Sequence, residues 1–184
     1  TIHIPRATML TVLVLANEVA LGAIPLWAML ADRIGRRPVF ILGALGSAAL
    51  IWPYLWALST ANIPLIFALG ILLSGVVYSA ANGVWPALYG EMFDTRVRLS
   101  GMAIGTQLGF ALGGFAPTIS AAILGDGPTG WIPVAAFTTG AAVVSAISAF
   151  TARETYRVPM AQLGKYGAAS AAPAPSSQRG AQTA

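Results

Sequence analysis

Five long apolar stretches, separated by short polar breaks, constrain this chain more than any other feature. They cover residues 8–30, 39–58, 64–88, 102–124 and 131–152. A helix needs about 20 mainly apolar residues to cross the hydrocarbon core of a bilayer, and each stretch is long enough. An open sheet would leave backbone groups unpaired in lipid, and the stretches lack the apolar–polar alternation of a membrane barrel. The sequence therefore predicts an all-α membrane protein with five transmembrane helices.

The composition agrees with a lipid environment. Of the 184 residues, 57% are hydrophobic and only 9% are charged, whereas a soluble domain carries about 25% charged residues. The chain has no cysteine, which excludes disulfides and thiolate metal sites. Its calculated pI is about 10.0, but the basic residues do not alternate with aromatic ones on a single face, so we expect no binding to nucleic acid.

The positions of the basic residues predict the orientation of the spans. If the five helices alternate in direction, only Arg6 falls on one side of the membrane. The other side receives Arg33, Arg36, Arg37, Arg96, Arg98, Arg153, Arg157, Lys165 and Arg179. Basic loops stay in the cytoplasm, so the C-terminus is expected there. Residues 165–184, mostly Ala, Pro, Ser, Gln and Gly, are predicted to be a disordered cytoplasmic tail.

The sharpest local motif is the first polar break, residues 28–38, which reads AMLADRIGRRP. Asp32 can accept hydrogen bonds at a helix end, and Gly35 permits a tight turn. Three arginines can clamp carboxylates or helix ends; they are Arg33, Arg36 and Arg37. We interpret the motif as a gate whose charged groups form ion pairs in one conformation of the protein and separate in another. The alternative is a set of ordinary basic anchors.

A second charged cluster, residues 91–98, follows the third apolar stretch and contains Glu91 and Arg96. By itself this cluster can be either a functional charge cluster or an ordinary solvated helix end, and neither interpretation is favoured. The first break, however, resembles the loop signature of the major facilitator superfamily, Gly-x-Leu-x-Asp-Arg-x-Gly-Arg-Arg, with Ala28 in place of the first Gly. The spacing of Glu91 and Arg96 resembles the cytoplasmic charge-relay element of the same superfamily.

Further segments resemble the metabolite–proton symporter branch of that superfamily. They are residues 93–101, 107–109, 113–117 and 153–156. This resemblance, which covers about residues 8–165, implies a twelve-helix bundle in which the chain supplies about helices eight to twelve. Residues 1–164 would then be part of the C-terminal half of the carrier, with the N-terminal half as its missing partner. It also implies a small polar metabolite and protons as ligands, no cofactor, and a bacterial-type plasma membrane.

Glu18 is the candidate for proton coupling. It lies near the middle of the first apolar stretch, where a carboxylate is costly and usually functional or internally paired. Thr11, Gly22 and Pro25 fall close to its helical face, so a polar stripe toward a cavity is feasible. A structural Glu that only holds helices together is the alternative.

The third stretch carries a possible solute path. Hydroxyl, amide and aromatic groups recur there at helical spacing, and they belong to Ser74, Tyr78, Asn82, Trp85 and Tyr89. Gln107 and Thr106 on the fourth stretch could face the same path. Polar contacts between helices are the alternative. The fourth stretch also has glycines at every fourth residue, at positions 101, 105, 109 and 113, which predicts a face for close helix packing.

These features favour a secondary active transporter, a proton symporter of an organic acid or zwitterion that is present here as an incomplete fragment. A non-transporting remnant, a structural module, and a uniporter or antiporter of the same fold remain alternatives. An enzyme is not expected, because the single histidine, His3, lies outside the apolar stretches and no catalytic or metal-binding spacing is present.

Overall fold

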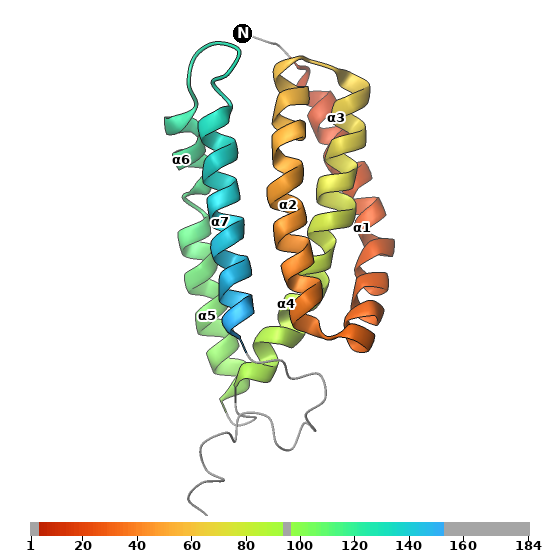
Figure 1. Ribbon diagram of the computed structural model, residues 1–184, viewed down its shortest axis with the longest axis vertical. Coiled ribbons are helices and arrows are strands. Elements are labelled where there is room, and N and C mark those ends of the chain that lie inside the picture. Colours follow the sequence, from red (N-terminus) through yellow and green to blue (C-terminus); the bar gives the residue numbers. More distant parts are fainter. Residues whose placement is uncertain (1–3, 94–96, 153–184) are drawn as a thin grey trace, which may run out of the picture.

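A computed structural model describes residues 4–93 and 97–152, and regular structure in these residues is entirely helical. Successive spans run in opposite directions, and the third and fourth spans each consist of more than one helical element (Figure 1). In chain order they are α1 (Arg6–Ile34), α2 (Arg36–Ser59), α3 (Ile63–Gly70), η1 (Ile71–Val77), α4 (Tyr78–Met92), α5 (Arg98–Gly113), α6 (Ala116–Ile123) and α7 (Ile132–Thr151).

Within the described residues, five helical segments are long and apolar enough to cross a membrane. They are Arg6–Ile34, Arg36–Ser59, the third span Ile63–Met92, the fourth span Arg98–Ile123, and Ile132–Thr151. The predicted all-α membrane fold is therefore confirmed, with helix ends that differ from the predicted ones by a few residues. The predicted disordered tail, residues 165–184, lies outside the described residues.

The third span is continuous but changes its helix type. Between α3 and α4, residues Ile71–Val77 form π-helical turns, in which the backbone bonds reach five residues along the chain instead of four. Side chains contact the backbone carbonyls of this segment. The Ser79 hydroxyl donates to the Gly75 carbonyl at 2.7 Å, and the Trp27 indole N–H of α1 donates to the Val76 carbonyl at 2.9 Å.

The fourth span is interrupted at Gly114 and Phe115, which separate α5 from α6. α5 ends at Gly113 and α6 begins at Ala116, and the Phe115 N–H bonds three residues back to the Leu112 carbonyl. Pro117 lies in the first turn of α6, where its absent N–H costs no helical hydrogen bond.

The packed core lies among α1, α2 and the third span. One cluster of buried side chains joins these three elements and consists of Ala31, Val39, Ala80 and Val84, with Trp27 against it. The α1 and third-span backbones approach closely at Gly75, where an added Cβ would lie 2.9 Å from the Ala16 carbonyl oxygen. Small residues thus allow close helix contact, as expected for helices in lipid.

Of the remaining helices, α7 is well packed, whereas α5 and α6 are attached loosely. α7 packs along α2, where the Trp52 indole N–H donates to the Thr139 hydroxyl at 3.0 Å and that hydroxyl donates to the Ala48 carbonyl at 3.3 Å. α5 and α6 contain no buried residue. Figure 1 shows them on the opposite side of the bundle from α1.

Candidate functional site

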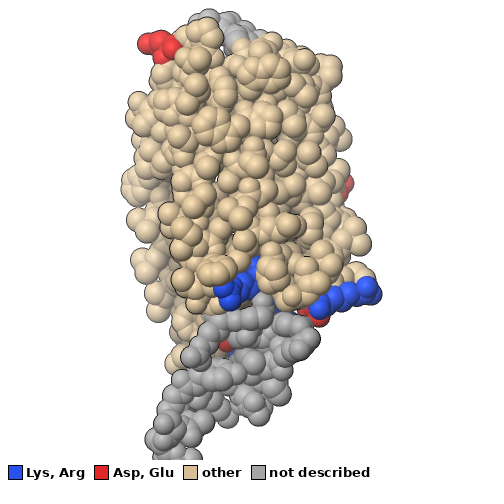
Figure 2. Space-filling model, viewed as in Figure 1, with Lys and Arg blue, Asp and Glu red and all other residues tan. Residues whose placement is uncertain are grey.

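A charged cluster lies at one end of the bundle, here named the charged end, where α1 and α4 end and α2 and α5 begin. It carries Asp32, Arg33, Arg36, Arg37, Glu91 and Arg98. Figure 2 shows the basic side chains gathered at the lower end of the molecule, while the visible flank of the helices is almost entirely uncharged. This distribution is the one expected of helices whose flanks face lipid and whose ends face water.

The turn between α1 and α2 consists of a single residue, Gly35. Its φ of 105° and ψ of 153° are strained for any residue with a side chain. The Gly35 N–H closes α1 by donating to the Ala31 carbonyl at 2.9 Å, and α2 starts at the next residue. Glycine at this position therefore brings the arginines of α2 directly against the end of α1.

Arg36 connects three helices at the charged end. Its guanidinium lies 3.0 Å from the Glu91 carboxylate of α4 and 3.6 Å from the Asp32 carboxylate of α1. The side chains of Arg36 and Glu91 are 20% and 13% exposed, whereas that of Asp32 is 70% exposed. The contact with Glu91 is therefore the shorter and drier of the two, and it ties the start of α2 to the end of the third span.

The other arginines of the motif have different surroundings. The Arg37 guanidinium lies 4.4 Å from the centre of the Phe150 ring, a cation–π contact that joins α2 to the end of α7. Arg33 is exposed. Arg96 lies outside the described residues. The pairing of Glu91 with Arg36, across two helices, was not predicted from the sequence.

Arg98, at the start of α5, was not among the predicted site residues. One of its guanidinium nitrogens donates to the Phe93 carbonyl at 3.5 Å, and its Nε is buried without a hydrogen-bond partner in the described structure. Its position within the second charged cluster, residues 91–98, could have identified it from the sequence.

Glu18 lies in the middle of α1 on an exposed face. The buried residues of α1, Val12, Ala16, Ala23 and Ala31, lie on the opposite face. Among residues 4–93 and 97–152, the Glu18 carboxylate has no ion-pair partner. Thr11, Gly22 and Pro25 are also exposed, so the described chain leaves the predicted polar face of α1 uncovered.

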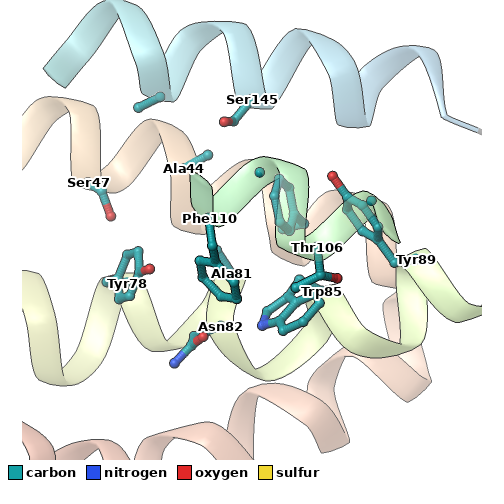
Figure 3. Close-up of a pocket in the computed structure, with 14 residues that line it drawn as sticks. Ala44, Ser47, Tyr78, Ala81, Asn82, Trp85, Tyr89, Thr106, Phe110 and Ser145 are labelled. Atoms are coloured by element: carbon teal, nitrogen blue, oxygen red, sulfur yellow. The ribbon is translucent and has the colours of Figure 1, made fainter. Parts of the chain in front are cut away.

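An open cavity of about 410 Å³ lies between α2, α4, α5 and α7 (Figure 3). Three predicted path residues line it, namely Tyr78, Asn82 and Trp85. Tyr89, which shares the helical spacing of these residues, lines it as well, and so does Thr106, which was expected to be able to face the path. Its other walls consist of Phe40, Ala44, Ser47, Ala81, Gly105, Gly109, Phe110, Ala142 and Ser145.

Two predicted path residues do not line this cavity. Ser74 is exposed within η1, one turn before the cavity wall, and Gln107 is exposed on α5. The structure thus brings the predicted path residues of α4 together at the cavity, but not Ser74 of η1 or Gln107 of α5. The wall residues of α2, α5 and α7 were missed because the sequence does not reveal which helices are neighbours.

The cavity wall is aromatic and neutral. The Trp85 and Tyr89 rings meet edge to face, with centroids 6.0 Å apart and an interplanar angle of 82°. The Ser47 Oγ is buried and has no hydrogen-bond partner in the described structure. No Asp, Glu, Lys, Arg or His is found among the described residues that line the cavity. The described residues also contain no group of three or more His, Cys, Asp or Glu that could hold a metal.

We compared the sequence of the chain with those of known protein families. The profile of the Major Facilitator Superfamily matches residues 2–179. The chain belongs to the Major Facilitator Superfamily. The resemblance predicted from the loop motif is thereby confirmed. No solved structure matches the chain significantly.

Its superfamily relatives include several bacterial transporters. The chain is 31% identical to the shikimate transporter of Escherichia coli (strain K12) over 155 residues, 84% of this chain and 35% of that protein. It is 31% identical to the proline/betaine transporter of the same strain over 136 residues, 74% of this chain and 27% of that protein. It is 34% identical to the citrate-proton symporter of Klebsiella pneumoniae over 119 residues, 61% of this chain and 27% of that protein.

The matched regions span only 27% to 35% of the length of these relatives. All three are named as transporters and none as an enzyme, which agrees with the expectation that this chain is not an enzyme. Superfamily membership and the five apolar spans of the described residues agree with a membrane protein of a transporter family.

Proposed function

We propose that the chain supplies five spans of a carrier that moves a small polar metabolite into the cell by proton symport. Its membership of the superfamily and its likeness to a protein named as a citrate-proton symporter support this reading. The relatives are named for shikimate, proline and betaine, and citrate, so they agree on a small polar solute without selecting one. Because the relatives are much longer than the matched region, the rest of a carrier of that size would complete the solute path.

The observation that carries proton coupling is the position of Glu18. A carboxylate halfway along a membrane-spanning helix is expensive in hydrocarbon. It can lower its free energy by taking up a proton or by facing a wet path. Both options leave the group able to exchange protons when the path opens to one side and then to the other. The exposed face of α1 gives this carboxylate access that a buried position in the core would deny.

The charged end is proposed to act as the gate of this carrier. Carriers of this kind rock one part against another around a central site. Arg36 is held by carboxylates from two other helices, so a movement of α4 relative to α2 has to break the contact with Glu91. Asp32 and Arg33 of α1, Gly35 in the turn and Arg37 of α2 flank Arg36 in the sequence, and these residues and Arg96 belong to the same proposed gate.

Uptake assays on the complete reading frame that contains this chain test the function. Cells that express it should accumulate a radiolabelled organic acid or zwitterion from a panel, and a protonophore should abolish that accumulation. Glu18→Gln should reduce accumulation to the equilibrium level while solute exchange across the membrane partly survives, because Gln keeps the shape and hydrogen bonding of Glu.

Asp126→Asn, in the exposed loop before α7, is the matched control and should accumulate solute normally. Full accumulation by Glu18→Gln would remove this residue from coupling. Accumulation that persists without a proton gradient would favour a uniporter or antiporter.

The orientation of the spans is part of the proposal. The charged end is placed in the cytoplasm of a bacterial cell because the basic residues concentrate there. The chain has no cysteine, so labelling of a single introduced cysteine shows on which side of the membrane that position lies. A cysteine at Asp126 should react with an impermeant reagent added outside the cell, and one at Arg33 should not. The reverse pattern would invert the orientation.

A further inference from the structure

Phe150, in the last turn of α7, is an aromatic residue at the charged end to which the proposed gate assigns no role. The central carbon of the Arg37 guanidinium lies 4.4 Å from the centre of its ring. A guanidinium within about 6 Å of a ring centre is attracted by the negative face of the ring. Phe150 is 67% exposed, so packing in the core does not explain the ring. Its contact with Arg37 distinguishes it from Val144 and Ile147, the other strongly exposed large apolar residues of α7.

The interface between α2 and α7 is held at two levels. Away from the charged end, the Trp52 indole of α2 donates to the Thr139 hydroxyl of α7 at 3.0 Å. The Trp52 ring also meets the Trp131 ring, just before α7, edge to face with centroids 6.0 Å apart. At the charged end, Arg37 and Phe150 hold the same two helices together. With a rise of about 1.5 Å per residue, the two levels lie roughly 20 Å apart along α2.

The cavity borders this interface between the two levels. Four small residues of the two helices line it there, namely Ala44, Ser47, Ala142 and Ser145. Figure 3 shows Ser145 of α7 across from Ala44 of α2. On both helices, the contact between Arg37 and Phe150 lies between these cavity residues and the charged end. Separation of the two helices at this contact would therefore open a route from the charged end to the cavity.

This contact differs in kind from the ion pair at the same end. The Arg36 guanidinium lies 3.0 Å from the Glu91 carboxylate, whereas Arg37 faces an uncharged ring. A cation–π contact at an exposed site is weaker than a hydrogen bond between charged groups. It favours a closed α2–α7 interface, yet it can break and form again in each transport cycle.

We propose that Phe150 is a positioning residue of the gate, which holds Arg37 toward α7 and keeps the α2–α7 interface closed between the cavity and the charged end. Opening of the carrier at this end then requires α7 to separate from Arg37, in addition to the separation of Glu91 from Arg36. Phe150 acts through Arg37 and contacts no solute in this role. The inference deepens the proposed function and rests on it, because it adds a residue to the gate.

Thiol labelling of the complete carrier measures how often the interface opens. The probe is a single cysteine at Ser145, on the α7 wall of the cavity, with any cysteine in the rest of the carrier replaced. A membrane-impermeant methanethiosulfonate is added to intact cells and to inside-out vesicles, so the charged end faces the reagent in one of the two preparations. In that preparation we expect Phe150→Leu to raise the labelling rate about two- to fivefold. An unchanged rate in both preparations would overturn the proposal.

Fluorinated phenylalanines separate the cation–π contact from the shape of the side chain. Each fluorine atom withdraws electron density and weakens the negative face of the ring, while the size of the ring changes little. With one, two and three fluorine atoms on the residue at position 150, the labelling rate should rise stepwise toward that of Phe150→Leu. The same series at Phe115, an exposed ring outside the α2–α7 interface, is the control and should leave the rate unchanged. A rate that does not follow the series at position 150 would refute the contact with Arg37.

A double-mutant cycle identifies the partner of the ring. Arg37 has further interactions, so Arg37→Gln alone reports more than this contact, and the cycle removes their contribution. Phe150→Leu should have no further effect in the Arg37→Gln background. An equal effect in both backgrounds would assign the ring to packing and overturn the proposal. If Arg37→Gln does not reach the membrane, the fluorine series decides alone.

The two proposals fail in different ways. Labelling is measured without solute and without a proton gradient, so it does not depend on coupling. A fluorine-dependent labelling rate in a carrier that accumulates no solute with protons would overturn symport and support the role of Phe150. Proton-driven accumulation by a carrier whose labelling rate ignores the fluorine series would support symport and overturn the role of Phe150.

Discussion

The third and fourth spans use glycine in opposite ways. In the third span, a Cβ added at Gly75 would lie 2.9 Å from the Ala16 carbonyl oxygen and 3.2 Å from the Val19 side chain. In the fourth span, a Cβ added at Gly105, Gly109 or Gly113 would meet nothing within 4 Å. The first span packs tightly against the third, while the fourth span contains no buried residue.

One expectation is met only in part within the described chain. The regular glycine spacing of the fourth span predicted a packing face, but within the described chain only Gly101 makes a close approach, to the Phe93 ring. Glycine spacing allows close packing but does not supply the partner. Gly105 and Gly109 instead border the cavity, where the absence of a side chain leaves space.

The largest expected effect comes from adding a methyl group to each region. Gly75→Ala should destabilise the carrier by about 1–3 kcal/mol, because the α1 backbone has to move. Gly109→Ala should be neutral or stabilise by up to about 1 kcal/mol, because alanine is the better helix former. Denaturation midpoints of the purified variants in one detergent measure both, and equal midpoints would break the comparison.

A second prediction concerns the charged end, where the third span is tied to α2. Glu91→Gln removes a half-buried charged contact and should cost about 1–3 kcal/mol of gate closure. Asp32→Asn removes a more exposed contact and should cost less than about 1 kcal/mol. Initial uptake rates, normalised to the amount of carrier in the membrane, measure the difference. A larger effect of Asp32→Asn would place the gate in the turn instead.

The smallest expected effect concerns the hydrogen bond between α1 and the π-helical segment. Trp27→Phe keeps a ring in the core but loses the N–H that reaches the Val76 carbonyl, which should cost about 0.5–1.5 kcal/mol. Trp56→Phe, at an exposed position of α2, serves as the control. If both variants melt at the same temperature, the third span does not depend on this contact.

The sequence predicted the spans well because hydrophobic length alone decides which segments cross a bilayer. It did not reveal the π-helical turns at 71–77, which lie where Gly75 approaches α1 and where the Trp27 indole of α1 donates to the Val76 carbonyl. The same limit applies to the site. Helical spacing placed Tyr78, Asn82 and Trp85 on one face of α4, but only the arrangement of α2 and α5 adds Ser47 and Phe110.

The π-helical turns also bear on how the chain can change in length. Each of their hydrogen-bonded rings encloses one residue more than an α-helical ring. Deleting one residue within Ile71–Val77 would let the span close as a regular α-helix while the flanking faces keep their neighbours. A deletion in α4 just before Trp85 would instead turn that residue by about 100° around the helix axis, away from the cavity. Homologous carriers that are one residue shorter in this span are therefore expected to have the gap at 71–77.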